Sequence, residues 1–220
     1  MAQIFRPAAD FWLRLLVLGA LLALVGSLVA AAGYADSSYA TRRGWVRDQP
    51  VPFSHAHHVG GLGLDCRYCH TTVESSAHAG LPSTQICMTC HSQEWTKAPM
   101  LAPVRRSWTT GQPLIWNRVA KLPDYVYFNH AIHIGRGVPC TTCHGRVDRM
   151  PLMMRAKPFE MNFCVDCHRD PLSKLVPAGR ITDPEPMKWS STEQHRFAAE
   201  AANDLRIDPA RLDKCDICHR

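Results

Sequence analysis

Residues 53–70 read Phe-Ser-His-Ala-His-His-Val-Gly-Gly-Leu-Gly-Leu-Asp-Cys-Arg-Tyr-Cys-His, and this stretch contains the smallest unit from which the rest of the chain is built. It ends in Cys66-x-x-Cys69-His70, the spacing at which two thiols bond covalently to a haem and the adjacent histidine binds its iron. His55 and His58 lie just upstream. Because haem iron has two axial positions, this stretch offers both a proximal and a distal ligand.

The same pentapeptide recurs along the chain until all 10 cysteines are used. The cysteines predicted to hold haem covalently are Cys66 and Cys69, Cys87 and Cys90, Cys140 and Cys143, Cys164 and Cys167, and Cys215 and Cys218. The predicted proximal ligands of the iron are His70, His91, His144, His168 and His219. The sequence therefore predicts five covalently bound c-type haems.

Two other uses of paired cysteines fit the pattern poorly. Zinc ribbons need two Cys-x-x-Cys pairs per metal ion, and five pairs each followed at once by histidine do not divide that way. Disulfides would suit an exported chain with an even number of cysteines, but disulfide chemistry has no use for the trailing histidine.

Length and composition indicate a fold in which the cofactors form most of the core. The chain has 220 residues, and if about 150 of them enclose five haems, roughly 30 remain for each. With 13 glycines and 16 prolines, we expect loops around the haems and short helices that carry the Cys-x-x-Cys-His segments. The predicted fold is a single N-terminal transmembrane helix followed by a loop-rich, mainly α multihaem cytochrome c domain with little regular secondary structure.

The formal net charge of +6 could suggest an acidic partner or an anionic membrane surface. Five haems would bring about 10 propionate charges, so the basic excess is interpreted as neutralisation of these carboxylates. The Lys and Arg residues do not form a dense run, and no nucleic-acid partner is expected.

An uninterrupted apolar run, Leu15 to Ala32, is just long enough to span a bilayer as a helix. We expect residues 1–35 to be an uncleaved membrane anchor; a signal peptide cleaved near Ala30-Ala31-Ala32 is the alternative. The flanking charges give no positive-inside signal. Because haem is attached covalently outside the bacterial cytoplasmic membrane, we expect a single-pass protein of that membrane with its haem domain on the periplasmic side.

The remaining chain is predicted to contain a duplicated two-haem module. Residues 36–50 form a polar tether, and Phe53-Ser54-His55-x-x-His58 then recurs as Phe128-Asn129-His130-x-x-His133, in register with the following motif. The predicted modules are residues 51–115 and 116–180, followed by a C-terminal segment, 181–220, for the fifth haem. In that segment Ser191-Thr192-Glu193-Gln194 resembles a capping box that opens a helix running to Leu205.

The arrangement Phe-x-His-x-x-His upstream of Cys-x-x-Cys-His is similar to the small class III multihaem cytochromes. In that family the first histidine ligates the haem of its own motif and the second ligates a later haem. The resemblance implies four pairs of axial ligands in this chain: His55 with His70, His58 with His91, His130 with His144, and His133 with His168.

The distal ligand of the fifth haem is open. Met150, Met153, Met154 and Met161 cluster between the third and fourth motifs, although such clusters more often fill gaps in a core. We favour Met153, because a His/Met haem has a higher potential than a bis-His haem and would give a relay a direction. His195, the only histidine near the last motif, is the runner-up, and His57 and His78 are not expected to be ligands.

All five motifs keep their proximal histidine, so no open iron and no substrate-converting site are expected, and the predicted role is electron relay. The anchor, the five motifs and the run Cys143-His-Gly-Arg-Val-Asp-Arg-Met-Pro-Leu-Met153 resemble the membrane-anchored pentahaem subunit of alternative complex III. That resemblance implies a quinol-oxidising complex, in which an iron–sulfur subunit and polytopic quinol-binding subunits would be the partners. Electrons would pass toward a monohaem cytochrome or a soluble periplasmic acceptor.

Two rival functions remain at the level of sequence. The first is a stand-alone, membrane-anchored multihaem quinol dehydrogenase; the anchored tetrahaem type should carry four motifs rather than five. The second is a multihaem terminal reductase, which would need an open coordination position on one iron.

Overall fold

The computed structural model describes residue 6 and residues 8–219, which divide into two compact units, Met1–Arg43 and Gly44–Arg220. The division into two modules and a C-terminal segment inside the second unit remains a prediction.

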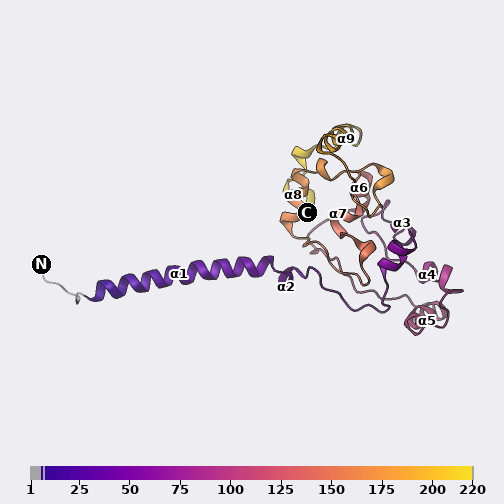
Figure 1. The fold of residues 1–220 in the computed structure, drawn as a ribbon, viewed down its shortest axis with the longest axis horizontal. Coiled ribbons are helices and arrows are strands. Elements are labelled where there is room, and N and C mark those ends of the chain that lie inside the picture. Colours follow the sequence, from indigo (N-terminus) through magenta and orange to yellow (C-terminus); the bar gives the residue numbers. More distant parts are fainter. Residues whose placement is uncertain (1–5, 7, 220) are drawn as a thin grey trace. The chain divides into compact units, whose positions relative to one another are not determined.

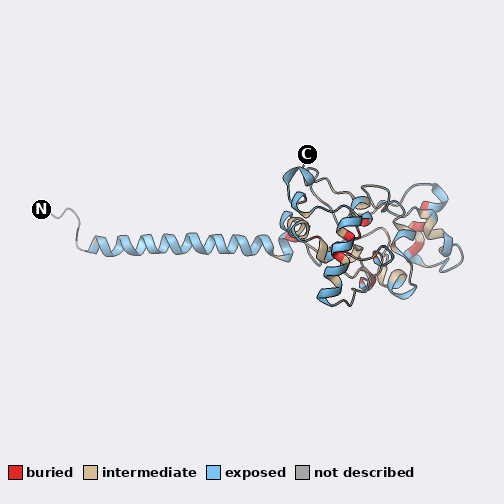
Figure 2. Ribbon diagram, turned by 90° about the horizontal axis from the view of Figure 1, so that it is seen from above, coloured by how far each residue is buried: buried red, intermediate tan, exposed pale blue. Residues whose placement is uncertain are grey.

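The first unit is dominated by helix α1 (Ala8–Asp36), which has 29 residues and no buried side chain (Figures 1 and 2). At 1.5 Å per residue it is about 43 Å long, enough to cross a hydrocarbon layer of about 30 Å. Among the described residues it is the one helix that is long and apolar enough to span a membrane. The short helix α2 (Ser38–Thr41) follows, and the Ser37 side chain caps it by accepting a hydrogen bond from the Ala40 amide.

The second unit consists of short helices joined by long loops (Figure 1). Its helices are η1 (Ala56–Gly61, a π-helix), α3 (Cys66–Cys69), α4 (Thr84–His91), α5 (Ala102–Thr110), α6 (His130–Gly135), α7 (Cys140–His144), α8 (Met161–Arg169), α9 (Ser191–Asp204) and α10 (Cys215–Cys218). Single 3₁₀ turns are η2 (Pro99–Leu101), η3 (Val147–Arg149), η4 (Leu172–Lys174), η5 (Ala178–Arg180) and η6 (Pro209–Arg211). Over the described residues the only strand-like pairing is an isolated bridge between Val46 and Met154. The predicted fold class is confirmed.

The apolar core of the second unit is small. Its buried hydrophobic residues include two clusters, Val51 with Leu101 and Val104, and Val73 with Ile134 and Ile181. Leu175 is the one large side chain that is almost completely buried among the described residues. The chain exposes 15528 Å², whereas a monomeric protein of this size exposes about 10,000 Å². The exposed helix α1 and the sparse burial in the second unit both contribute to this excess (Figure 2).

Helix α9 forms where the sequence predicts a C-terminal helix, but its cap lies one residue earlier than expected. The capping box is formed by Ser190 and Glu193, with the Ser190 hydroxyl accepting from the Glu193 amide and the Glu193 carboxylate accepting from the Ser190 amide. The predicted Ser191–Gln194 pair was therefore wrong, because Ser190 already has the extended backbone that a cap requires.

The π-helix η1 packs closely against η3. A methyl group at Gly60 would overlap the backbone carbonyl of Asp148, so the two turns touch backbone to backbone. The Asp148 carboxylate is buried and accepts two hydrogen bonds from the Arg146 guanidinium, at 2.8 and 2.6 Å. The Arg146 guanidinium holds the pKa of Asp148 below its usual value. This contact fixes the turn that carries His58.

Replacing Gly60 with alanine is predicted to push η1 away from η3 and to destabilise the domain by roughly 1–3 kcal/mol, as overpacking does. Gly61→Ala is the matched control, because a methyl group there meets nothing closer than 3.8 Å. Denaturation of the two variants by guanidinium measures the difference. Equal stabilities would contradict the backbone contact.

Asp148→Asn is predicted to cost about 1.5–3 kcal/mol near neutral pH, the range for hydrogen bonds to a charged group. A carboxylate whose folded pKa is depressed contributes stability above its unfolded pKa of about 3.9 and loses it as the pH falls through the lower folded value. The gap between wild type and variant should therefore be constant from neutral pH down to about pH 5 and close below about pH 4. A gap that persists undiminished at pH 2 would be inconsistent with this ion pair.

Candidate haem sites

The two copies of Phe-x-His-x-x-His adopt the same local geometry. The Phe53 ring meets the His55 ring edge-on at 4.8 Å and the His58 ring at 4.3 Å. In the second copy, Phe128 meets His130 at 4.7 Å, also edge-on, and His133 at 4.4 Å. The phenyl ring thus sets the angle between the two imidazoles in both copies, although the first lies on a π-helix and the second on α6.

Three of the histidines upstream of the motifs lie close to a predicted proximal histidine. The ring centres are separated by 6.2 Å for His58 and His91, 6.4 Å for His130 and His144, and 6.1 Å for His133 and His168. Two imidazoles bound to opposite sides of one metal ion have ring centres about 6 Å apart, given a metal–nitrogen bond of about 2.0 Å. These pairs therefore fit a single iron held between them.

A hydrogen bond from ring to backbone orients most of these imidazoles. His58 Nδ1 lies 2.9 Å from the Ser54 carbonyl oxygen, and His133 Nδ1 lies 2.8 Å from that of Asn129. The same contact is made by His70 to Gly80, His91 to Glu94, His130 to Ala77, His168 to Leu212 and His219 to Tyr125. With Nδ1 donating to a carbonyl, Nε2 keeps its lone pair for a metal.

Burial favours the neutral form of four of these histidines, the form that binds iron. It lowers the pKa of His144 to about 4 and also lowers the pKa values of His58, His130 and His133. A neutral imidazole can bind a metal ion without first losing a proton.

His55 lies in the same environment but with a different set of contacts. Burial lowers its pKa to about 4, with a smaller contribution in the same direction from the nearby His70 imidazole. Its Nδ1 is buried and has no hydrogen-bond partner. His55 thus lies near His70. The role of His55 as the distal ligand of the first haem stays a prediction.

The fifth motif differs from the others. The His219 ring stacks on Tyr125 at 5.8 Å, and the Cys218 carbonyl accepts a hydrogen bond from the Tyr127 amide at 2.8 Å. Met153 is half-buried and His195 is exposed on α9, and neither has a described contact with His219. The distal ligand of this site is therefore still a prediction, with Met153 ahead of His195.

The ten cysteines are free thiols placed on α3, α4, α7, α8 and α10. The Cys66 and Cys140 thiols contact each other. Within the described part of the chain, no three His, Cys, Asp or Glu side chains converge on a point where they could hold a bare metal ion. Three histidine pairs have ring centres 6.1–6.4 Å apart, and the proximal histidine of each follows a pair of thiols in its motif, a donor set that fits a haem.

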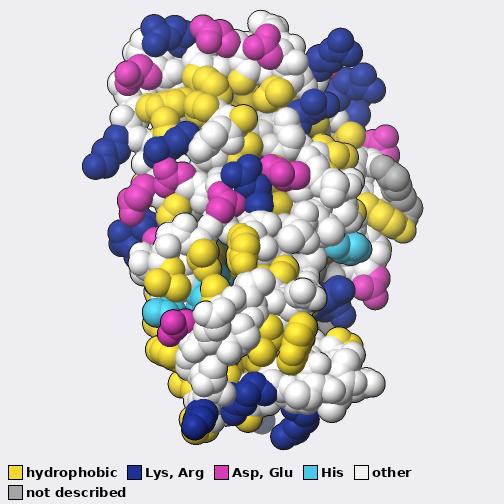
Figure 3. Space-filling view, turned by 90° about the vertical axis from the view of Figure 1, so that its right-hand side faces the viewer, with side chains coloured by type: hydrophobic (Ala, Val, Ile, Leu, Met, Phe, Trp, Pro, Cys, Tyr) yellow, Lys and Arg dark blue, Asp and Glu magenta, His cyan; other side chains and the backbone are white. Residues whose placement is uncertain are grey.

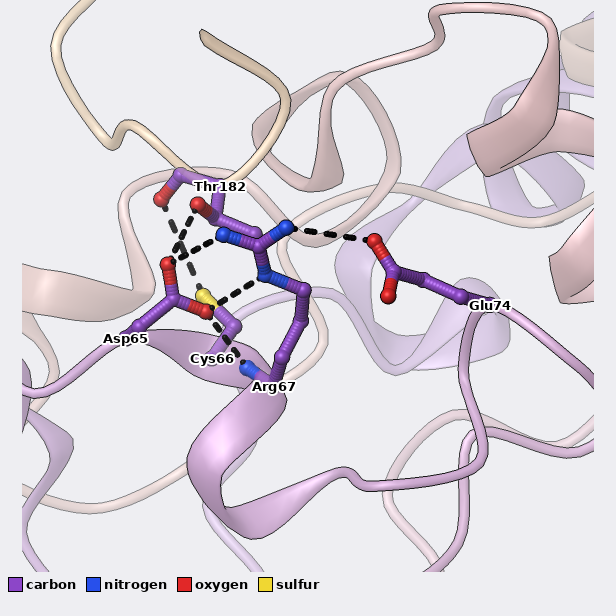
Figure 4. A network of polar contacts seen from close by, with 5 residues as sticks. All are labelled: Asp65, Cys66, Arg67, Glu74 and Thr182. Carbon is purple, nitrogen blue, oxygen red and sulfur yellow. Dashed lines mark hydrogen bonds and ion pairs between the residues drawn. The ribbon is translucent and has the colours of Figure 1, made fainter. Parts of the chain in front are cut away.

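Two features of the site were not predicted from the sequence. The exposed His57 stacks on Trp95 at 5.9 Å and touches His58 edge-on at 5.2 Å, so it covers one side of a candidate ligand. The second is a polar network around the first motif (Figure 4). Neither has a spacing signal, because the partners are distant in sequence or lie on irregular loops.

In this network, Asp65 accepts hydrogen bonds from the Arg67 side chain and from the Thr182 hydroxyl, the latter at 2.8 Å (Figure 4). Arg67 also reaches Glu74 at 3.2 Å. The Arg67 guanidinium holds the pKa of Asp65 at about 2, so this carboxylate is charged next to Cys66 at physiological pH.

Asp65→Asn is predicted to raise the midpoint potential of the haem held by Cys66 and Cys69, because a nearby negative charge favours the oxidised iron. The expected change in the reduction equilibrium is about 3–10-fold, or roughly 30–60 mV at 59 mV per tenfold for one electron. Spectroelectrochemical titration measures it. Glu74→Gln is the matched control, since Glu74 binds the same Arg67 side chain but, unlike Asp65, is not adjacent to Cys66 in the chain. An equal shift in both variants would argue against a local effect of Asp65.

The family models and the relative that match parts of this chain are all c-type cytochromes. Residues 126–220 match the family of cytochrome c7 and related cytochrome c, and residues 33–108 match the class III cytochrome c family. One relative is the menaquinone reductase multihaem cytochrome c subunit of Nitratidesulfovibrio vulgaris, 37% identical over 99 residues. That alignment covers 44% of this chain and 46% of the relative, so the chain spans less than half the length of the relative that it matches.

Proposed function

We propose that this multihaem c-type cytochrome relays electrons through five haems within a quinone-linked membrane complex. The observation that carries the proposal is the set of three histidine pairs with ring centres 6.1–6.4 Å apart, each containing the histidine of a Cys-x-x-Cys-His motif. When bound, the haems supply one-electron chemistry. The histidine side chains would hold the haem irons, and their Nδ1 hydrogen bonds to backbone carbonyls would orient them.

Filling both axial positions favours electron transfer over substrate conversion. With a side chain on each side of an iron, no coordination position would remain for a small substrate. Hydrogen bonds to the Ser54 and Asn129 carbonyls orient the rings of His58 and His133. The proposed pairs are His55–His70, His58–His91, His130–His144 and His133–His168, with Met153 opposite His219.

The proposed partners are membrane subunits. Helix α1 exposes its whole apolar surface, which suits a single-pass anchor that packs against other transmembrane helices. The haem domain would then lie on the periplasmic side of the bacterial cytoplasmic membrane. Basic and acidic side chains are interspersed over most of the face in Figure 3, so that face does not suit a nucleic acid.

In the finer form of the proposal, the complex is alternative complex III. Electrons would come from an iron–sulfur subunit that serves polytopic quinol-binding subunits. They would leave toward a monohaem cytochrome or a soluble acceptor. The resemblance of the five-motif architecture to the pentahaem subunit of that complex supports this form.

The opposite direction is the second candidate. The relative from N. vulgaris is named as a subunit of a menaquinone reductase. By analogy, this chain would deliver electrons from a periplasmic donor toward the quinone pool.

Electron paramagnetic resonance of the oxidised holoprotein tests the relay. We expect low-spin ferric signals from five haems per chain, with no change on adding cyanide, because every iron would have two protein ligands. A high-spin signal that cyanide converts to low-spin would contradict the relay and favour a terminal reductase.

The direction can be tested in membranes that contain the intact complex. Reduction of the haems by added menaquinol, without any periplasmic donor, would support quinol oxidation. If the haems stay oxidised with menaquinol but pass electrons from a low-potential donor to menaquinone, the result would contradict quinol oxidation and support quinone reduction.

A further inference from the structure

The contacts between motifs determine which candidate haem sites are neighbours. The sites are numbered here by the order of their motifs in the sequence: first (His70), second (His91), third (His144), fourth (His168) and fifth (His219).

The second and first sites are neighbours. The hydroxyls of Tyr68, inside the first motif, and Thr89, inside the second, lie 2.9 Å apart. His58, which faces the second motif's His91, is three residues from His55, which lies beside His70. A single short turn therefore serves both sites.

The first and third sites meet where the two copies of the repeat come together. The loop at Ile181 and Thr182 adjoins both motifs, since the Cys66 sulfur lies 3.8 Å from the Thr182 carbonyl oxygen and the Ile181 carbonyl accepts from the Cys140 amide at 3.1 Å. Asp65 fastens the same loop through the Thr182 hydroxyl (Figure 4). The equivalent cysteines of the two copies thus face each other.

A second set of contacts supports the same junction. His130, which faces the third motif's His144, binds the Ala77 carbonyl of the first copy through Nδ1 at 2.9 Å. The backbone amide of Ala131 binds Ser76 in the same loop. Val73 and Ile134 are buried together beside them.

The third and fourth sites are neighbours through helix α6 and an aromatic bridge. His130 and His133, on one face of α6, face His144 and His168 respectively. Phe159 lies 6.0 Å from the His144 ring and 5.8 Å from Phe163, which is on the helix of the fourth motif.

The fourth and fifth sites are joined by the segment that leads into the last motif. His168 Nδ1 binds the Leu212 carbonyl at 2.8 Å, and Arg169 lies 3.8 Å from Asp213. Both partners are three or fewer residues from Cys215. Cys164 also lies close enough to Cys218 for the two thiols to influence each other.

We propose that the five haem sites form one unbranched row in the order second, first, third, fourth, fifth, with the junction of the two repeats in its middle at Cys66, Cys140 and Thr182. This order differs from the order of the motifs in the sequence. It rests on the proposed haem-binding function. The row has two ends, at the sites of His91 and His219, and electrons cross from one repeat to the other only between the first and third sites.

Electrostatic coupling gives one test with a matched pair of variants. A methionine in place of a distal histidine raises the potential of that haem, and adjacent haems respond to its altered charge state. His58→Met acts on an end site and is expected to shift one further couple, whereas His133→Met acts on an inner site and is expected to shift two. A redox titration followed by electron paramagnetic resonance counts the shifted couples. Two further shifts in the His58 variant would contradict an end position.

The direct test is the position of the irons in the purified holoprotein, from diffraction at the iron edge or from cryo-electron microscopy of its complex. Each iron is assigned by its proximal histidine. The expected result is that the first iron has the second and third as nearest neighbours, and the fourth has the third and fifth. A branch, or direct proximity of the second and fifth irons, would overturn the row. Fewer than five irons would contradict the proposed haem count, and the order would still be judged on the irons present.

Discussion

The structure depends on one geometric constraint, that two imidazole rings face each other with their centres about 6 Å apart. The polypeptide of the second unit has a small apolar core and no sheet among its described residues, so it cannot hold such pairs by ordinary packing. It uses two local devices instead. A phenyl ring is wedged against both histidines of each copy, and backbone carbonyls accept hydrogen bonds from Nδ1. Together these devices leave Nε2 of each ring directed away from its own backbone partner.

The two copies of the repeat have the same contacts within each Phe-x-His-x-x-His segment. Their contacts differ at the junction where one copy packs against the other. The contacts of Phe53 and Phe128 agree to within 0.1 Å between the copies. At the junction, His130 Nδ1 finds the Ala77 carbonyl, whereas His55 Nδ1 has no partner. Asp65 precedes the first motif of one copy, and Pro139 occupies that position in the other. A negative charge lies beside the first motif and none lies at the same position beside its counterpart. This difference would give the two otherwise similar haem sites unequal reduction potentials.

Much of the fold could be predicted from the sequence, because its signals are local. The short helices with Cys-x-x-Cys-His, the long apolar helix α1 and helix α9 all follow from spacing and composition within a few residues. The cap of α9 was misplaced by one residue, since two adjacent serines, Ser190 and Ser191, offer the same chemistry and only the backbone distinguishes them. The histidine pairs implied by family resemblance lie near one another, but their ligation of iron remains a proposal.

What could not be predicted are the partners that come from distant loops. Three proximal histidines donate from Nδ1 to backbone carbonyls, those of Gly80, Leu212 and Tyr125. Every residue has a backbone carbonyl, so the residue type does not indicate which one will accept. Thr182 reaches Asp65 across 117 positions. The order of the sites in space depends on such contacts, and for this reason it differs from the order of the motifs.

The central claim is that all ten cysteines hold haem. Intact-mass spectrometry of the chain, purified under denaturing conditions that remove every non-covalent ligand, tests it most directly. The account predicts a single species heavier than the polypeptide by five haem masses, with no thiol left to react with an alkylating reagent. A chain with the mass of the bare polypeptide, or with reactive thiols in any of the five motifs, would contradict it.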